Sequence, residues 1–323
     1  MRRVFRSAAI FGTLLMIALP ASGQTYPDRV IKIVVGAPPG GGLDVLVRAL
    51  AQELTARWGK SVVVDNRPGA SGLISAEAVA NAPPDGYTWL AVTDQIYLAN
   101  RFAFKALPYN PDGFANISLV AQADQFVLAT ASLPVRNIRE LVALDRQKPG
   151  SVAYGSWGDG STPQLLFETL NKTAGTAFLN VPYKGVAPVL NALSTDEVQL
   201  SAVSGGTAGP LLKAGKVRPL AIAAKSRATE YPDVPTTAEA GYPTLQAFIW
   251  FGLAAPAGTP IAIIERASAE VRDIAKQPAF AERYITSLGW KFVASTPVEM
   301  DATIKAELPI IREMIMNAGV KPQ

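Results

Sequence analysis

Two glycine-rich segments contain the residue types best suited to chemistry in this sequence. The first runs from Gly36 to Gly42 (GAPPGGG) and the second from Gly155 to Thr162 (GSWGDGST). Each follows a short apolar run and precedes a helical pattern, so its backbone N–H groups lie at a helix start, where the helix dipole favours negative charge. Glycines also let a ligand approach the backbone closely. We therefore predict that the two segments bind an anion.

The alternative for each segment is an ordinary strand-to-helix turn, in which glycine only satisfies tight geometry. For a single loop of this kind that alternative is the commoner one. Two such loops in similar units favour ligand binding, and Ser156, Ser161 and Thr162 add hydroxyl donors to the second loop. We expect the side chain of Asp44 or Ser161 to cap its helix.

The absence of two residue types limits the reactions that this protein could catalyse. The 323 residues include no histidine and no cysteine, which excludes histidine bases, thiolate nucleophiles, disulfides and His/Cys metal sites. The first loop does not match the dinucleotide pattern because Val45 replaces its last glycine, and Gly59-Lys60-Ser61 lacks the earlier P-loop glycine, at Leu54. We predict a protein that is not an enzyme and needs no cofactor or metal. Paired carboxylates leave an exported hydrolase or isomerase as the alternative.

The N-terminal residues have the pattern of an export signal. Three arginines within the first six residues precede an uncharged apolar stretch from Ala8 to Leu19, and a proline and small residues follow. We predict a signal peptide over residues 1–23, cleaved near Gly23, and a soluble periplasmic product. Export by the general secretory route and by the twin-arginine route both remain open.

The signal also accounts for most of the net charge of +4. Of the 30 basic residues, three lie in the signal, so 27 remain against 26 acidic residues after cleavage. No basic cluster is left. The mature chain therefore lacks the electrostatic basis for binding nucleic acid.

The elements that position the two loops form two similar units. In each unit an apolar run, a glycine-rich loop, a helix and a second apolar run follow one another. The alternation predicts an α/β fold with mostly parallel sheets in two lobes, and a ligand cleft at the carboxyl ends of the strands. The segments are Ile31–Val35, Leu43–Trp58 and Val62–Val64 in the first unit, and Val152–Tyr154, Pro163–Ala174 and Ala177–Val181 in the second.

A series of short motifs runs along the chain from about Tyr26 to Lys321. The motifs are YP at 26–27, PPGGGLD at 38–44, DNRPGA at 65–70, PDGYT at 84–88, LPY at 107–109, YGSWGDGST at 154–162, VPYKG at 181–185, KAGK at 213–216, PDVPT at 232–236, WFG at 250–252 and APAGTP at 255–260. With these motifs the chain resembles the Bug-type periplasmic solute-binding receptors of tripartite tricarboxylate transport systems. Each motif is short, but their order and number make the resemblance specific.

The resemblance implies a two-lobe Venus-flytrap of the type II periplasmic-binding-protein fold. Such a receptor holds a small carboxylate through main-chain groups of both loops and through ordered water. We add Trp157 to the implied site because a tryptophan among glycines is costly to expose. We interpret Trp250 and Phe251 as packing between the lobes. The predicted site residues are Pro38, Gly40, Gly41, Gly42, Asp44, Thr93, Asp94, Ser156, Trp157, Gly158, Gly160, Ser161, Thr162, Tyr183 and Ser204.

Several positions depart from the family pattern. Ala37 replaces an aromatic residue, Leu43 a hydroxyl residue and Gln164 a histidine. Val203-Ser204 replaces a Phe-Asp pair, and losing that acid argues against a ligand that carries an amine. These differences favour a larger, less polar pocket, suited to an aromatic or a long-chain acid.

We therefore expect a monomeric periplasmic receptor that closes on a carboxylate, because the ligand binds the closed state better. The expected partners are the subunits of an inner-membrane permease or, as the alternative, a sensor kinase. The first lobe is predicted over residues 27–129 and 252–323, and the second over 130–251. The C-terminal helix is expected to pack on either lobe.

Overall fold

The computed structural model describes residues 26–247, 249–320 and 322–323. The predicted signal peptide lies outside the described residues. The strands are β1 (Ile31–Val35), β2 (Val62–Asn66), β3 (Thr88–Thr93), β4 (Phe114–Ala123), β5 (Phe126–Thr130), β6 (Ala153–Ser156), β7 (Leu179–Pro182), β8 (Leu200–Val203), β9 (Val217–Ile222), β10 (Ile249–Pro256) and β11 (Trp290–Phe292). The helices are α1 (Gly42–Trp58), α2 (Leu73–Ala80), α3 (Asn100–Ala103), α4 (Ile138–Gln147), α5 (Thr162–Ala174), α6 (Val186–Ser194), α7 (Gly209–Lys213), α8 (Ile261–Ala275), α9 (Pro278–Tyr284) and α10 (Pro297–Ala318), with short helical turns η1 (Ala70–Gly72), η2 (Gln95–Ala99) and η3 (Thr286–Leu288).

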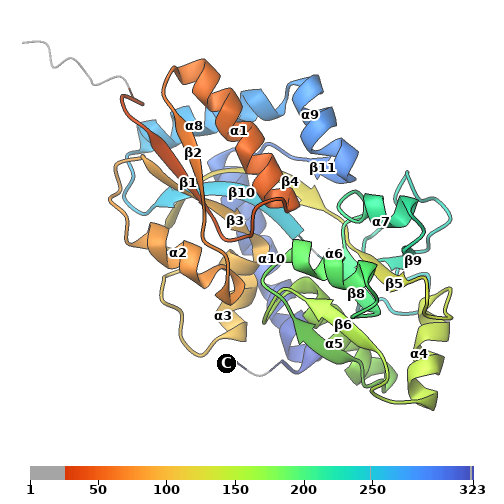
Figure 1. The fold of residues 1–323 in the computed structure, drawn as a ribbon. Coiled ribbons are helices and arrows are strands. Elements are labelled where there is room, and N and C mark those ends of the chain that lie inside the picture. Colours follow the sequence, from red (N-terminus) through yellow and green to blue (C-terminus); the bar gives the residue numbers. More distant parts are fainter. Residues whose placement is uncertain (1–25, 248, 321) are drawn as a thin grey trace, which may run out of the picture.

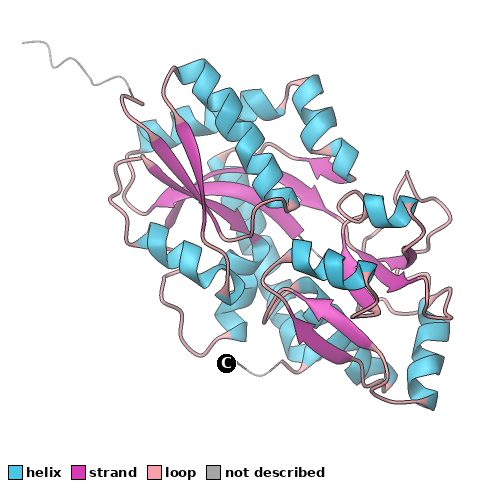
Figure 2. Ribbon diagram, in the orientation of Figure 1, coloured by secondary structure: helices cyan, strands magenta, loops and turns pink. Residues whose placement is uncertain are grey.

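Two sheets divide the fold into two parts (Figures 1 and 2). The six-stranded sheet, in the order β11-β4-β10-β3-β1-β2, and the helices packed on it form the first lobe. The five-stranded sheet, in the order β7-β6-β8-β5-β9, and its helices form the second lobe. The chain enters the second sheet at β5 and re-enters the first at β10. The predicted boundaries, after residues 129 and 251, fall inside these two strands, a few residues after each crossing.

The sheets are mixed, so the prediction of mostly parallel sheets is wrong. The predicted units do give parallel pairs, β1 with β2 and β3, and β6 with β7 and β8. In contrast, β10 is antiparallel to β3 and β4, β11 to β4, and β5 to β8 and β9. The pairs of β5 and β10 are antiparallel because these strands enter their sheets directly from the other lobe, without the strand–helix–strand crossover that makes neighbours parallel.

Each sheet has a hydrophobic core on both faces. In β1, successive side chains point to opposite faces, so Ile31 and Ile33 pack with Leu50 of α1 while Val34 packs on the side of Met300 in α10. Helices α1, α8 and α9 cover the first face of this sheet, and α2 and α10 the other. In the second lobe, α4 and α5 cover one face and α6 and α7 the other. This layering brings the starts of α1, α5 and α6 to the side where the lobes meet (Figure 1).

The C-terminal helix α10 packs on both lobes. Met300 and Ile304 belong to one apolar cluster with Trp250 of β10 and Leu165 of α5. Near its end, the main-chain oxygen of Met316 accepts a hydrogen bond of 3.3 Å from Lys172 Nζ of α5. The helix therefore contacts both lobes. The sequence predicted that it packs on one lobe or the other and did not decide between them. Among the described helices, α10 included, none has both the length and the apolar character needed to cross a membrane.

Candidate ligand-binding site

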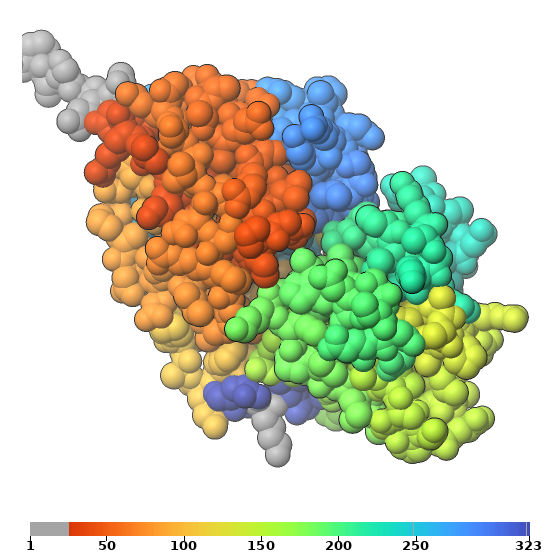
Figure 3. Space-filling view, viewed as in Figure 1, coloured from red at the N-terminus to blue at the C-terminus, as the bar shows by residue number. Residues whose placement is uncertain are grey.

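A cavity of about 260 Å³ lies between the two lobes. Pro38, Gly41 and Gly42 line it from the first lobe, and Trp157 and Tyr183 from the second. The cavity lies at the carboxyl ends of β1, β3 and β6, which is where open α/β sheets place their ligands. Figure 3 shows the orange surface of the first lobe meeting the green surface of the second along this face.

Most of the predicted site residues line this cavity, and the rest lie behind it. The lining residues among them are Pro38, Gly41, Gly42, Thr93, Asp94, Trp157, Gly158, Thr162, Tyr183 and Ser204. Gly40, Ser156, Gly160 and Ser161 belong to the same two loops, and Asp44 to the first turn of α1, but these five residues do not line the cavity. The structure thus brings the predicted residues to one place, while their contact with a ligand stays a prediction.

Asp44 holds the first loop together. Its carboxylate accepts hydrogen bonds from Gly40 N (2.9 Å), Arg48 Nε (2.9 Å) and Asn66 Nδ2 (2.8 Å). Burial alone would raise the pKa of Asp44, but these hydrogen bonds and the Arg48 charge lower it. Asp44 is therefore a charged residue that fixes the loop in front of α1. The expected side-chain cap is wrong, because Gly41 is the N-cap and Asp44 reaches back to Gly40 instead.

The second loop is braced in a similar way by the first turn of its helix. Gln164 Oε1 of α5 accepts a hydrogen bond of 2.7 Å from Gly160 N. Ser161 is the N-cap residue, yet its hydroxyl makes no capping bond, so that expectation is wrong as well. The hydroxyl oxygens of Ser156 and Ser161 are buried and have no hydrogen-bond partner within the described part of the chain.

The second loop contacts the first lobe directly. The main-chain oxygen of Asp159 accepts hydrogen bonds from Ser71 Oγ (3.1 Å) and Gln95 Nε2 (2.8 Å). Gly158 makes this approach feasible, because it has a positive φ of 113° and a Cβ there would lie 2.6 Å from Ser71 Oγ. At position 158, the left-handed backbone and the close approach of Ser71 therefore both favour glycine. The conformation described is one in which the lobes are closed.

Trp290 joins the lobes on another side of the cavity. Its indole Nε1 donates a hydrogen bond of 2.9 Å to Ser204 Oγ, in the loop after β8. Its ring lies against Gly42, where a Cβ would come within 2.5 Å of a ring carbon. The Phe251 ring packs against the same indole in a tilted arrangement, and both residues line the cavity. Trp290 is not predictable from the sequence, because a tryptophan of a short strand far along the chain has no motif around it.

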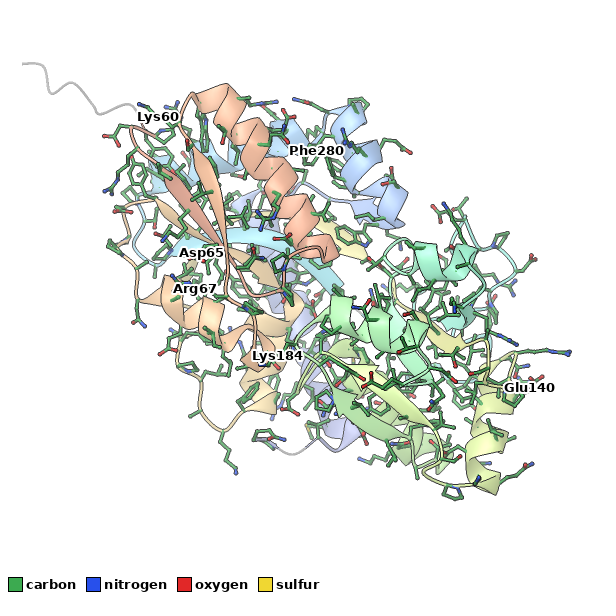
Figure 4. The ribbon with its side chains drawn as sticks, viewed as in Figure 1. Lys60, Asp65, Arg67, Glu140, Lys184 and Phe280 are labelled. Carbon is green, nitrogen blue, oxygen red and sulfur yellow. The ribbon has the colours of Figure 1, made fainter. Side chains whose placement is uncertain are left out.

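A third helix start was also missed. Val186 and Ala187, the first residues of α6, line the cavity beside Gly185. Next to them is Lys184, the one cationic side chain among the cavity-lining residues in the described ranges. Figure 4 shows Lys184 where the two lobes meet. The signal in the sequence was Gly185 before a helical pattern, which repeats the arrangement of the two glycine-rich loops.

Asp94 lies in the cavity wall at the end of β3 and is buried. Burial raises the pKa of Asp94 well above its ordinary value, and the nearby Glu307 carboxylate raises it further. This environment favours the protonated form, which can donate a hydrogen bond. Glu307 itself accepts a hydrogen bond of 2.8 Å from Trp250 Nε1. Trp250 is fully buried in packing, as expected, whereas Phe251 lines the cavity.

A family model described as the tripartite tricarboxylate transporter family receptor matches residues 46–319. This chain belongs to that receptor family. Among its relatives, the protein BugT of Bordetella pertussis is 32% identical over 323 residues, which cover 99% of each chain. A second protein of the same species, described as a UPF0065 protein, is 30% identical over 310 residues, covering 96% of each chain.

Solved structures of similar receptors confirm the two-lobe periplasmic-binding-protein fold. Rpa4515 of R. palustris, solved with adipate, is 33% identical, with a TM-score of 0.88 over 92% of this chain and 100% of its own. The periplasmic binding protein BugD is 30% identical, with a TM-score of 0.85 over 92% of this chain and 100% of its own. MatC from Rhodopseudomonas palustris, solved with bound malate, is 29% identical, with a TM-score of 0.84 over 90% of this chain and 100% of its own.

Proposed function

We propose that this receptor is exported by its N-terminal signal and captures a small organic carboxylate as a monomer in the periplasm. The observation that carries the proposal is the convergence of three helix starts on one cavity. Gly42 of α1, Thr162 of α5 and Val186 of α6 all line it. At each start, backbone N–H groups without a partner in the helix and the helix dipole favour a negatively charged group.

Two similar receptors support the choice of ligand class. Rpa4515 was solved with adipate and MatC with malate, and both ligands are carboxylates. Because the chain belongs to a transporter receptor family, the bound acid is delivered to the inner-membrane subunits of a permease. Delivery requires a closed state that forms around the ligand and opens again. The contacts of Asp159 and Trp290 between the lobes provide that closed state.

The receptor returns its ligand unchanged. The acidic side chains that line the cavity in the described residues are Asp94 and Asp159. An exported hydrolase or isomerase would need one of them as a base and would convert the acid with time. We expect instead that a carboxylate recovered from the complex by denaturing the protein is chemically identical to the acid supplied, at one molecule per chain.

Blocking the cavity tests the site. Gly41 lines it with an ordinary φ of −75°, and a Cβ there meets only the oxygen of Pro38, at 3.8 Å. A Gly41→Leu variant should therefore fold normally while its side chain occupies ligand space. In a thermal-shift series with mono- and dicarboxylates at millimolar concentration, the unmodified chain should gain several degrees, and Gly41→Leu should gain none.

The matched control is Gly209→Leu at the start of α7. Gly209 does not line the cavity, and an added Cβ meets nothing within 4 Å. This variant should retain the full ligand-induced shift. If no carboxylate raises the melting temperature of the unmodified chain, the proposed function is wrong; if Gly41→Leu responds like Gly209→Leu, the site lies elsewhere.

A further inference from the structure

The cavity has aromatic side chains in both of its walls. Phe251 and Trp290 line it from the first lobe, with ring centroids 4.4 Å apart and planes at 37°. Trp157 and Tyr183 line it from the second lobe. A ligand enclosed by the two lobes therefore has aromatic surface on both sides. Aromatic rings prefer offset or edge-to-face contact with other rings, and such contacts are favourable beyond the burial of area alone.

Several polar side chains around the cavity are hydrogen-bonded to other groups of the protein. Ser204 Oγ accepts from Trp290 and donates to Thr207 Oγ1, at 2.8 Å. Ser71 and Gln95 donate to the main chain of Asp159. These side chains hold the walls in place by bonding other groups of the protein. The helix starts, with Lys184 just before α6, are then the groups that receive the carboxylate, while the rest of the ligand contacts the apolar and aromatic lining.

The size of the cavity suits a ring with a substituent. A dry cavity of about 150 Å³ in another protein takes up benzene, and the cavity here measures about 260 Å³. The volume beyond that needed for a benzene ring leaves room for a carboxylate. A flexible chain of similar volume would also fit, but it would lose the freedom of its rotatable bonds on binding, which a rigid ring does not.

From these observations we infer that the ligand is an aromatic carboxylic acid. Its ring packs against the Phe251–Trp290 pair and its carboxylate lies at the helix starts. Phe251 thereby determines specificity through its ring. Trp290 has two roles, because the same indole that forms the wall also bonds Ser204 across the lobes. The inference rests on the proposed function, since it names the class of carboxylate that the receptor captures.

Paired ligands that differ only in ring aromaticity test the inference. Benzoate is compared with cyclohexanecarboxylate, and terephthalate with its saturated counterpart, by calorimetric titration of the chain without residues 1–23; adipate serves as the flexible acid. The aromatic member of at least one pair should bind about 3- to 10-fold tighter than its saturated counterpart and tighter than adipate. Saturated acids or adipate binding as tightly would overturn the aromatic ligand and leave the carboxylate receptor standing. Binding of none of the five acids would overturn both.

Single-residue variants test which side chain causes the preference for aromatic acids. Phe251→Leu should reduce the ratio of aromatic to saturated affinity towards one, and an unchanged ratio would overturn the role of Phe251. The matched control is Phe292→Leu on β11, since Phe292 is 39% exposed and does not line the cavity. Trp290→Phe keeps a ring but removes the indole donor, so it should weaken both members of a pair equally. Circular dichroism checks the fold, and Phe251→Met replaces Phe251→Leu if the leucine variant does not fold.

Discussion

At the scale of single residues, Asp94 was predicted to line the cavity, yet its acidic side chain is the one least suited to an anionic ligand. An ionised carboxylate in the cavity wall would repel an anionic ligand, whereas a protonated carboxyl group would not. Burial and the neighbouring Glu307 raise the pKa of Asp94 and so favour the protonated form. An aspartate at the end of β3 is thereby compatible with a bound acid.

Asp94→Asn tests this interpretation through the pH dependence of stability. An acid whose pKa is raised in the folded state is favourable below its unfolded pKa of about 3.9, and its contribution is lost as pH rises towards the folded pKa. Asparagine cannot ionise. We therefore expect Asp94→Asn to melt at a higher temperature than the parent at pH 8, with the advantage shrinking as pH falls towards about 4. Melting curves at pH 4, 6 and 8 measure this; a variant that is less stable than the parent at pH 8 would contradict it.

At the scale of elements, the first glycine-rich loop has its shape because one charged side chain of the following helix holds it. Asp44 of α1 bonds the loop at Gly40, and Asn66 at the end of β2 bonds both Asp44 and the oxygen of Ala37. Strand, loop and helix are thus fixed as a unit before any ligand arrives. The N–H groups at the start of α1 need no rearrangement to meet an anion.

Removing this carboxylate should destabilise the protein. Asp44→Ala leaves the donors of Gly40, Arg48 and Asn66 without their acceptor, at a cost of about 1–3 kcal/mol in the free energy of unfolding at pH 7. Because the pKa of Asp44 is lowered on folding, its contribution is present above the unfolded pKa of about 3.9 and is lost as pH falls through the folded pKa. Urea unfolding at pH 7 and pH 3 measures both effects.

The exposed Asp233 provides the control for this change. Asp233→Ala should alter the unfolding free energy by less than about 0.5 kcal/mol at either pH. If Asp44→Ala is no more destabilising than Asp233→Ala at pH 7, the carboxylate does not hold the loop.

The individual elements also differ in how well the sequence predicts them. The strand–loop–helix units were predictable because their signals are local: a short β-branched run, glycines and a 3.6-residue apolar period. Strands β5 and β10 were missed because their place depends on partners in sheets assembled from distant segments. For the site, the two loops were found from their glycines. Trp290 and Lys184 were not, because only the closed fold brings them to the cavity.

At the scale of the whole molecule, closure depends on places where the lobes touch without side chains between them. Gly206, in the loop after β8, lies against the main chain of Leu288 in the first lobe, and a Cβ there would overlap it. Because the overlap is with main chain and not with a flexible side chain, one of the two segments must move to make room. A substitution at Gly206 is therefore expected to impair closure of the lobes without preventing either lobe from folding.

A Gly206→Ala variant should fold but not close fully. We expect a ligand affinity at least 10-fold weaker and, in saturating ligand, a radius of gyration by small-angle X-ray scattering that stays at the value of the ligand-free parent. Gly209→Ala, three residues on, has open space around its Cβ and should behave like the parent. A Gly206→Ala variant that compacts on ligand addition as the parent does would show that this contact does not limit closure.

The position of α10 has a consequence for how the protein unfolds. Leu165 of the second lobe shares an apolar cluster with Val34, Trp250 and Ile304 of the first. If one lobe melted alone, it would expose part of the other lobe's interior to water. Two lobes connected only by loops could unfold one after the other, whereas lobes that share a core are expected to lose structure in a single cooperative transition.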